Sequence, residues 1–358
     1  MPLLAAAGTS APHPAPPRGR SGERVLLVRL SAIGDIVHTL PVAAALAEAG
    51  YEVVWAVQPA GRLLVEGNPA VASCMVIPAS SPFRPAAIFR AIGALRAARP
   101  ETALDLQGLW KSSFWARASG ATRRIGWSGP ARREPASSVL LTERRALPAS
   151  IAHVIDKNLA LLATLGLDAV GRRDFPLPPF EREAARVDRE LAALDLERPV
   201  LLHPGGGWVS KLWPAESYGE LASRLARRRI PTLVSWGPGE EGLAERVVAA
   251  SGGTAIACFP ASLLELAALA RRARAIVAAD TGPLHLACAV GAPAVALFGP
   301  TDPARNGPWN QSDRVVSRRP PCFPCHRRDC ATHRGILNEI PVAEVEQALL
   351  QRIGLADR

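Results

Sequence analysis

A single aspartate, Asp35, stands in the segment RLSAIGDIVHTLP, where an apolar run gives way through a short Ser/Gly loop to a helical pattern. An aspartate at this point has two uses. Its carboxylate can accept backbone N–H groups at the start of the helix, as capping residues do. At the edge of a sheet it can instead take a proton from a substrate hydroxyl, as a general base. Taken alone, the segment favours capping and leaves both uses open.

Four glycine-containing loops in the second half of the chain form another candidate site. They are HPGGGWVSK, WGPGEE, ADTGPLH and FGPTDP, and each follows a short apolar run that predicts a strand. In an open parallel sheet, ligands bind beyond the carboxyl ends of the strands. We therefore expect the four loops to meet at one edge of one sheet and to form a single binding site.

The first of these loops has the residues that a phosphate group requires. Its glycines, Gly205, Gly206 and Gly207, allow backbone N–H groups to approach an anion closely. Lys211, four residues further on, would neutralise a phosphate charge, although an ordinary surface lysine fits the sequence as well.

The loop ADTGPLH brings Asp280, Thr281 and Gly282 to the start of a helix, whose N-terminus favours negative charge. His285 faces either the ligand or the core, and Asp280 is also a capping candidate. Glu240 and Glu241, after GPG, suit hydrogen bonds to ribose hydroxyls, as acids at strand ends often make. They equally suit the first turn of a helix. The four loops together indicate a nucleotide diphosphate ligand.

Several familiar motifs are absent from the sequence. No G-x-G-x-x-G follows a predicted strand and no G-x-x-x-x-G-K-[ST] occurs, which argues against a dinucleotide site and a P-loop. No two aspartates stand one residue apart. We therefore expect lysine, backbone N–H groups and a helix dipole to neutralise the diphosphate without a metal ion or other cofactor.

The elements that must hold these residues alternate regularly. Strands are expected over 24–30, 52–57, 72–78 and 102–108, and again over 199–205, 231–237, 254–258, 274–280 and 293–299. Apolar strands separated by amphipathic helices predict parallel sheets covered on both faces, in a doubly wound α/β arrangement. The proline-marked segment DFPLPPFERE is the best linker candidate, so the domains are expected at 22–178 and 179–341, with a closing helix in 342–358.

The chain has 358 residues, of which 48% are hydrophobic, and a net charge of +10. Residues 1–21 are expected to form a disordered tail that makes a poor secretory signal, and no apolar run is long enough to span a bilayer, so the protein is expected to be cytoplasmic. The basic stretch 106–133 holds no acid and would attract phosphates, anionic lipid headgroups or nucleic acid. A solvated basic face is the alternative. No nucleic-acid-binding motif accompanies the charge, so nucleic acid is not expected as a partner.

The six cysteines fall into two groups. Cys74, Cys258 and Cys288 lie in apolar segments and are expected to be small core residues. The segment CFPCHRRDCATH spaces a second group as C-x2-C-x4-C-x2-H, which would suit a structural zinc site formed by Cys322, Cys325, Cys330 and His333. Reduced thiols on a loop are the favoured interpretation, because this spacing is not a standard finger pattern.

Four motifs together resemble glycosyltransferase family 9, the lipopolysaccharide heptosyltransferases: SAIGDIVHTLP, LDLQGLWKS, HPGGGWVSKLWP and ADTGPLHLACAVGAPAVALFGPTDP. The resemblance extends from Arg24 to the last helix and implies a GT-B architecture, in which two Rossmann-like domains face each other across a cleft. It implies that the last helix returns to the first domain. It also implies ADP-heptose as donor, the Kdo–lipid A inner core of lipopolysaccharide as acceptor, and inverting transfer without a metal at the cytoplasmic face of the inner membrane.

Carried onto this sequence, the resemblance makes Asp35 the general base. It assigns the donor to Gly206, Gly207, Ser210, Lys211, Asp280, Thr281, Gly282 and His285, with either Glu240 or Glu241 at the ribose. On the acceptor side, the matching motifs and the basic stretch suggest Ser31, Gly34, His38, Gln107, Lys111, Arg123 and Arg124. Glycines stand where type I enzymes tend to carry hydroxyl side chains in the phosphate loop.

The segments GPARREPASSVLLTER and HVIDKNLALLATLGL resemble heptosyltransferase I, which adds the first heptose to Kdo. CFPCHRRDC looks more like heptosyltransferase II and other members of the family. Type I is favoured, and a transferase that adds a later core sugar is the alternative. Outside this class, a nucleotide-sugar epimerase or a non-catalytic nucleotide-binding protein would share the two-domain layout.

Overall fold

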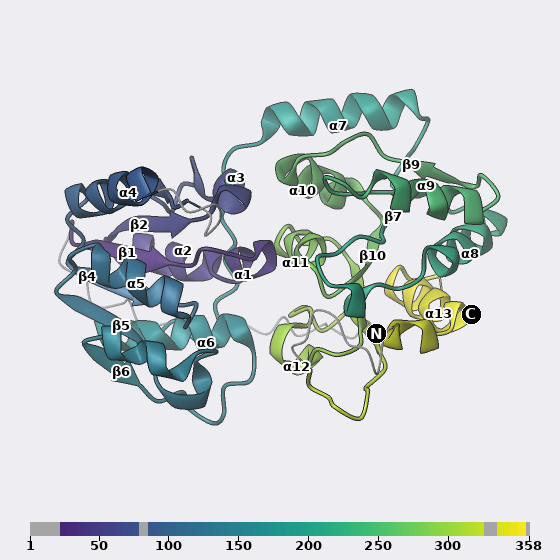
Figure 1. Ribbon diagram of the computed structural model, residues 1–358. Coiled ribbons are helices and arrows are strands. Elements are labelled where there is room, and N and C mark those ends of the chain that lie inside the picture. Colours follow the sequence, from purple (N-terminus) through teal and green to yellow (C-terminus); the bar gives the residue numbers. More distant parts are fainter. Residues whose placement is uncertain (1–21, 79–84, 326–334, 356–358) are drawn as a thin grey trace, which may run out of the picture.

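The computed structural model describes residues 22–78, 85–325 and 335–355. Within these ranges the chain forms two six-stranded parallel sheets, each covered by helices and lying side by side (Figure 1). The expected tail over 1–21, and Cys330 and His333 of the candidate zinc site, lie outside the described residues. No helix among the described residues is both long and apolar enough to cross a membrane.

The first sheet is built from the apolar runs that begin the chain. Its strands, in spatial order, are β3 (Ser73–Val76), β2 (Glu52–Val57), β1 (Arg24–Val28), β4 (Thr102–Asp105), β5 (Arg123–Trp127) and β6 (Glu143–Arg145). All its pairings are parallel, with Leu26 opposite Val54 and Ala103. The sequence did not predict β5 and β6, because both begin or end in arginines rather than in an apolar run.

The second sheet repeats the arrangement. Its strands are β12 (Arg314–Ser317), β11 (Ala294–Phe298), β10 (Ala275–Ala279), β7 (Val200–His203), β8 (Thr232–Val234) and β9 (Ala255–Ala257). Strand order reverses between β10 and β7, so the crevice beyond their carboxyl ends is where a ligand is expected to bind. The predicted doubly wound architecture is confirmed, and the two sheets fall within 22–178 and 179–341.

Helices cover both faces of each sheet. On the first sheet, α4 (Pro85–Ala97) and α5 (Trp110–Ala118) bury Leu95 and Trp115 against one face. The remaining helices of that half are α1 (Ile33–Val37), α2 (Leu40–Glu48), α3 (Arg62–Val65) and α6 (Val154–Ala160). The second half contains α7 (Glu181–Ala193), α8 (Ala215–Arg227), α9 (Glu241–Ala250), α10 (Leu263–Arg272), α11 (Gly282–Ala289), α12 (Pro303–Asn306) and α13 (Val342–Arg352).

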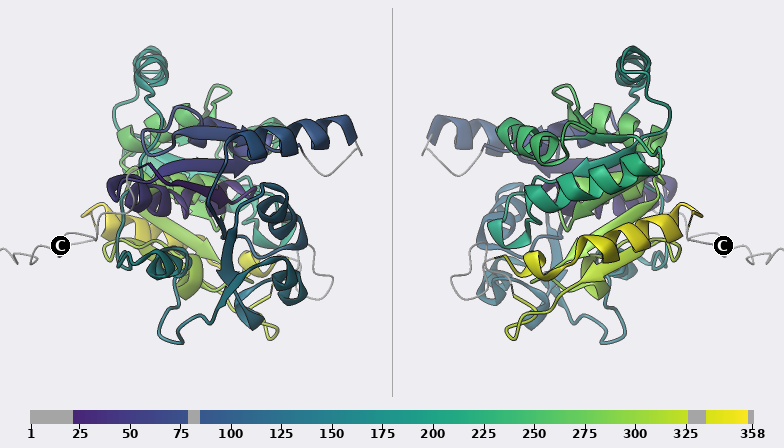
Figure 2. Two further views of the ribbon diagram at one scale, coloured as in Figure 1. Left: turned by 90° about the vertical axis from the view of Figure 1, so that its left-hand side faces the viewer. Right: turned by 90° about the vertical axis from the view of Figure 1, so that its right-hand side faces the viewer.

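The expectation that the closing helix returns to the first domain is wrong. The helix α13 packs beside α8 on the second sheet, as the right-hand view of Figure 2 shows. Its apolar stripe of Val345, Leu349 and Leu350 belongs to the same buried cluster as Val277 and Val295. The helix α13 has one apolar face, which it buries against the nearest uncovered part of the second sheet, and this explains its placement.

The two halves touch through the starts of α1 and α11. A Cβ atom at Gly34 would lie 2.5 Å from Cδ2 of His285, and one at Gly282 would lie 2.8 Å from Cβ of Ile33. Both distances are too short for a side chain, so glycine at each position lets the helices approach closely. Three histidines line this contact: the ring of His38 lies 4.2 Å from that of His285 and 6.1 Å from that of His153, centroid to centroid.

The loop 130–133 is held to the first sheet by a buried ion pair. Nη2 of Arg132 lies 2.7 Å from Oδ2 of Asp105, and neither side chain is exposed. The same nitrogen donates to Oγ of Ser113 at 2.6 Å and to Oγ of Ser137 at 2.7 Å. Asp105, at the end of β4, and Ser113 of α5 therefore fix this loop through the guanidinium group of Arg132.

We expect Asp105→Ala to lower the free energy of unfolding by about 3–5 kcal/mol, because it leaves the Arg132 charge buried without a partner. Urea unfolding followed by circular dichroism measures the change. Glu66→Ala is the matched control, since it removes one partner of the exposed Arg62–Glu66 pair and should leave the midpoint near that of the unaltered protein. Equal midpoints for both variants would contradict the structural importance of the buried pair.

The histidine contact predicts acid sensitivity. Burial and the neighbouring His285 and His153 hold the pKa of His38 well below its usual value, while Asp280 opposes and Arg29 adds to this effect. Folding therefore favours neutral His38, so its contribution to stability is complete above about pH 6.5 and is lost as the pH falls below that value.

His38→Gln should flatten the plot of unfolding free energy against pH below this point, by up to about 1.4 kcal/mol per pH unit, the value for one proton. Urea titrations at a series of pH values measure the slope. Parallel plots for the variant and the unaltered protein would exclude His38 as the titrating group.

Candidate active site

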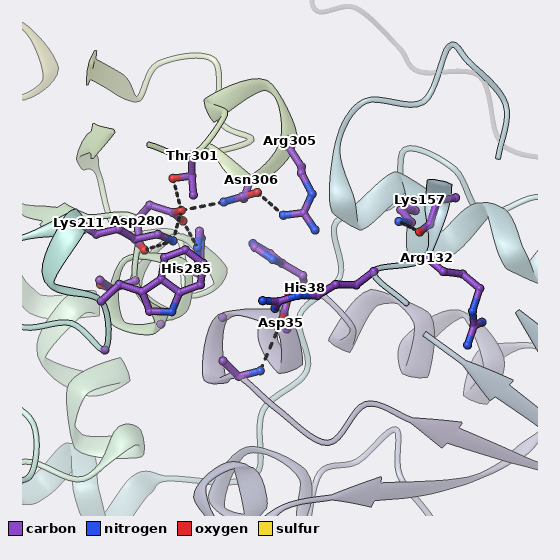
Figure 3. A pocket seen from close by; sticks show the side chains of 18 of the residues that line it. Asp35, His38, Arg132, Lys157, Lys211, Asp280, His285, Thr301, Arg305 and Asn306 are labelled. Atoms are coloured by element: carbon purple, nitrogen blue, oxygen red, sulfur yellow. Dashed lines mark hydrogen bonds and ion pairs between the residues drawn. The ribbon is translucent and has the colours of Figure 1, made fainter. Parts of the chain in front are cut away.

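A cavity of about 550 Å³ opens where the two halves meet (Figure 3). From the first half, the start of α1, the loop 130–133 and Lys157 of α6 line it. From the second half, loops that follow β7, β10 and β11 line it, together with α12. A smaller hollow of about 120 Å³ continues behind Asp35 toward Gln107. Three of the four predicted loops therefore converge at this edge of the sheet and meet the first half across the cavity. The fourth, after β8, does not line the cavity and contacts the glycine loop HPGGGWVSK through Glu240 instead.

Asp35 stands on the first-half wall, with its side chain 38% exposed. Its Oδ1 accepts a hydrogen bond of 2.8 Å from Nη2 of Arg29, which is itself buried. Its Oδ2 lies 3.4 Å from the backbone nitrogen of Ala32, the residue that precedes α1. The carboxylate is thus in the first turn, where it weakly caps the helix, and it remains open to the cavity. Capping and catalysis are compatible at this position.

On the opposite wall, the carboxylate of Asp280 is hydrogen-bonded to four side chains. Its Oδ2 accepts hydrogen bonds from Nζ of Lys211 at 2.6 Å, Oγ1 of Thr301 at 2.6 Å and Nδ2 of Asn306 at 2.9 Å. Its Oδ1 lies 3.0 Å from Nε2 of His285, so that nitrogen carries the proton, because a carboxylate only accepts.

The carboxyl group of Asp280 is ionised although it is buried. Burial raises the pKa of Asp280, but the hydrogen bond from His285 and the charge of Lys211 outweigh it and hold the pKa well below its usual range. With its side chain only 2% exposed, Asp280 acts on a ligand chiefly through the groups that it orients. The ammonium group of Lys211 is fixed from a second side, since it lies 4.6 Å from the ring centre of Trp208.

In the loop HPGGGWVSK after β7, glycine is required at position 205 because the carboxylate of Glu240 lies against it. A Cβ atom at Gly205 would lie 2.0 Å from Oε2 of Glu240, so the carboxylate occupies the space of a side chain there. Glu240 accepts hydrogen bonds of 2.9 Å from the backbone N–H groups of Gly206 and Gly237. It therefore bridges two of the four loops, whereas Glu241 is the exposed first residue of α9. The geometry selects Glu240 over Glu241 as the acid within the loop cluster.

Many of the predicted site residues line the cavity, and others do not. Those that line it are Gly34, Asp35, His38, Gly207, Lys211, Asp280, Thr281, Gly282 and His285. Nearby in the first half, Oε1 of Gln107 accepts the N–H of Leu30 at 3.0 Å and Nζ of Lys111 lies 3.5 Å from Oγ of Ser31. Ser210 is buried, and Gly206 is engaged by Glu240.

Arg123 and Arg124 do not belong to the site, contrary to the prediction. They begin β5, whereas the cavity lies beyond the carboxyl ends of the strands. Nε of Arg123 lies 2.7 Å from Oε1 of Glu143, and Nε of Arg124 donates to the carbonyl of Leu140 at 3.0 Å. The prediction fails because the unforeseen strand β5 carries these side chains away from the loops that follow it.

Several cavity residues were missed from the sequence: Trp208, Arg132, Arg133, Lys157, Thr301, Arg305 and Asn306. Thr301 lies in FGPTDP, the predicted loop that follows β11, so the rule that ligands bind beyond strand ends also indicates this residue. Lys157 carries no such signal, because it lies within an ordinary helix. Burial, together with the charge of Arg305, lowers its pKa to about 8.

Two of the three cysteines that were expected in the core are buried there. Cys258 and Cys288 are buried and Cys74 is half-buried, and burial raises the pKa of each thiol. Cys322 is exposed. Among the residues that the structure describes, no group of three or more His, Cys, Asp or Glu side chains is arranged to hold a metal ion.

Comparison with known proteins gives the family. The model of glycosyltransferase family 9 (heptosyltransferase) matches residues 88–334. A Pseudomonas aeruginosa protein named lipopolysaccharide heptosyltransferase 1 is 33% identical over 86% of this chain and 87% of its own length. The protein of the same name from Escherichia coli K12 is 30% identical over 83% of this chain and 94% of its own length.

Solved structures agree on the fold. A glycosyltransferase of family 9 from Veillonella parvula has a TM-score of 0.77 at 18% identity and covers 95% of this chain and 99% of its own. An Escherichia coli heptosyltransferase with ADP has a TM-score of 0.69 at 23% identity, covering 93% of this chain and 99% of its own. With its two parallel sheets and the shared cavity between them, this chain belongs to glycosyltransferase family 9, the heptosyltransferases, and is a glycosyltransferase of the GT-B fold.

Proposed function

We propose that this enzyme transfers a heptose from ADP-heptose to the Kdo–lipid A inner core of lipopolysaccharide, with inversion at the anomeric carbon and with Asp35 as general base. One observation carries the proposal. The half-exposed carboxylate of Asp35 and the ammonium group of Lys211 line one cavity from opposite halves of the molecule. This arrangement suits a base that faces the acceptor and a cation that faces the leaving diphosphate.

In the proposed reaction the oxygen of an acceptor hydroxyl attacks C1 of the heptose. The bond from C1 to the β-phosphate oxygen breaks with its electron pair, and the hydroxyl proton passes to Asp35. General-base catalysis of this kind contributes typically ~10²–10⁴-fold. Arg29 holds one carboxylate oxygen, which fixes the direction in which the other faces the cavity.

The departing ADP develops charge on its β-phosphate. Lys211 and the N-terminus of α11, which begins at Gly282 after Thr281, are the groups that would stabilise it. Asp280 holds Lys211 in place for this task. Glu240 would meet the adenosine ribose, with Ser210 and the glycine loop beside it. The scheme needs no metal ion or other cofactor.

The acceptor side of the cavity is rich in cations. Arg133 and Lys157 line it from the first half, beside Arg132 at the end of the buried pair, and Arg305 of α12 lines the cavity with them from the second half. The carboxylates of Kdo and the phosphates of lipid A are anionic, so this composition supports an inner-core acceptor. The enzyme would then work at the cytoplasmic face of the inner membrane, held peripherally by its charge.

Two comparisons support the choice of donor and the type of enzyme. The relatives at 33% and 30% identity carry the name lipopolysaccharide heptosyltransferase 1, whereas an Escherichia coli protein named heptosyltransferase 2 is 25% identical. An Escherichia coli heptosyltransferase of the same fold was solved with ADP-2-deoxy-2-fluoro heptose. A UDP-N-acetylglucosamine 2-epimerase shares the fold at a TM-score of 0.51. Membership of glycosyltransferase family 9 favours a transferase over an epimerase.

We expect Asp35→Asn to lower kcat by ~10²–10⁴-fold, because the amide cannot accept the proton. ADP should still bind with an unchanged Kd, since the ADP-facing groups lie in the other half. Mass spectrometry of the product, with Kdo–lipid A and with heptosylated core as acceptors, measures transfer and identifies the acceptor; calorimetry measures ADP binding.

Asp302→Asn is the matched control for this variant, because Asp302 caps α12 without lining the cavity. If the two variants lose activity equally, the loss is a general effect of removing a carboxylate near the cavity, and the base assignment of Asp35 fails. If Asp35→Asn turns over at the unaltered rate, the base assignment fails.

Transfer is expected to survive dialysis against EDTA with no more than a small change in rate, because Lys211 and the α11 N-terminus supply the positive charge that a metal ion would otherwise give. The rate of ADP release with and without added magnesium measures this. A loss of activity that magnesium restores would contradict the metal-free scheme.

A further inference from the structure

The outer surface of α5 carries aromatic side chains that neither the cavity nor the core uses. Trp110 is 48% and Phe114 is 44% exposed, although large aromatic side chains are usually buried. Arg117 is also exposed, and the spacing of the three residues is i, i+4, i+7, so they form one stripe along the helix. This stripe is apolar at the start of α5 and cationic at its end.

The neighbouring 3-10 helix η3 (Pro135–Leu140) extends the stripe into a broader surface. It packs against α5, and its Val139 is 62% exposed. Arg144 and Arg124 adjoin it, since Nε of Arg144 donates to the carbonyl of Ser138 and Nε of Arg124 to that of Leu140, each at 3.0 Å. We define the α5/η3 face as Trp110, Phe114, Arg117, Arg124, Val139 and Arg144.

The charge of this face is predominantly positive. Burial and the nearby charge of Arg117 lower the pKa of the Arg124 guanidinium, which agrees with a close approach of these two cations. Of the acids beside the face, Glu134 accepts the backbone N–H of Trp110 at 2.6 Å and so caps the start of α5, and Glu143 pairs with Arg123 and Arg145. Two exposed arginines, Arg117 and Arg144, and the partly buried Arg124 thus lie beside three exposed apolar side chains.

The α5/η3 face adjoins the cation-lined side of the cavity. The loop that contributes Arg132 and Arg133 to the cavity leads directly into η3. Leu109, which lines the smaller hollow, immediately precedes Trp110. A flat anionic surface that touched this face would therefore lie next to the acceptor side of the cavity.

We propose that the α5/η3 face is the surface by which the enzyme rests on an anionic phospholipid bilayer, with Trp110 and Phe114 at headgroup depth and its arginines on lipid phosphates. Tryptophan favours the membrane–water interface, and arginine binds phosphate through its planar fork. The inference rests on the proposed function in one respect, namely that a lipid-linked acceptor gives such a contact its use.

Binding to vesicles, in the absence of donor and acceptor, tests this surface directly. The full-length protein should cosediment with vesicles of equal parts phosphatidylglycerol and phosphatidylcholine, less so as salt is raised, and only weakly with phosphatidylcholine alone. Trp110→Ala/Phe114→Ala should lower the partition coefficient on the order of tenfold by removing apolar contact area. Arg117→Ala should lower it about fivefold, the effect of ~1 kcal/mol per cation.

Two matched variants control for the loss of any exposed apolar or basic side chain. Leu63 of α3 is as exposed as Trp110, and Arg227 lies on the exposed side of α8, so Leu63→Ala and Arg227→Ala should bind vesicles like the unaltered protein. The tryptophan emission of the unaltered protein should shift to the blue on vesicles, and Trp110→Phe should reduce that shift.

Equal vesicle binding by the Trp110/Phe114 variant and the unaltered protein would overturn the proposal, as would equal binding to both kinds of vesicle. A loss of self-association in the variant, seen by sedimentation equilibrium, would make the face an interface between copies instead. Transfer to a detergent-dispersed acceptor should be unaffected by Trp110→Ala/Phe114→Ala. Vesicle binding without any transfer by the unaltered protein would refute the proposed function alone.

Discussion

The close approach of α1 and α11 is the contact on which the site depends. Glycines at positions 34 and 282 leave no Cβ atom between the two helix starts, so the halves of the molecule meet at backbone distance. Asp35 follows the first glycine and Thr281 precedes the second, which brings the two walls of the cavity together at this point. A side chain at either glycine would require the halves to separate, and the cavity would lose its geometry. Both glycines serve packing between the halves, whereas the sequence suggested the acceptor for Gly34 and the donor for Gly282.

Charge within the second half is organised around one carboxylate. The carboxylate of Asp280 is hydrogen-bonded to four side chains. Lys211 donates to one of its oxygens and His285 to the other. The low pKa that results keeps the carboxylate ionised, so it maintains the ammonium group at the cavity wall. The arrangement explains why a residue that resembles a ligand contact is almost fully buried. Its effect on a ligand is indirect, through the position of the groups around it.

The basic stretch 106–133 illustrates how one run of sequence divides in space. Arg132 is buried in an ion pair, Arg123 pairs with Glu143, Arg133 lines the cavity, and Arg117 lies on the outer side of α5. Strand β5 and helix α5 run through this stretch and direct successive side chains to different surfaces. A linear count of charge predicted an anionic partner, but it could not tell which cations are available to one.

The sequence by itself determined the apolar strands of both sheets, the loops that carry chemistry and the family, because apolar strands, glycine turns and helix starts are local signals. It did not determine β5 and β6, which are rich in arginine. It correctly predicted that Asp280 directly follows a strand, and that Asp35 and Lys211 lie in the segments that connect a strand to the next long helix. Only the tertiary structure decided what each of them meets. The choice of Glu240 over Glu241, the contribution of Lys157 and Arg305, and the return of α13 to its own sheet all depend on contacts between residues far apart in the chain. Such contacts are set by the packing of whole elements, and no local pattern encodes them.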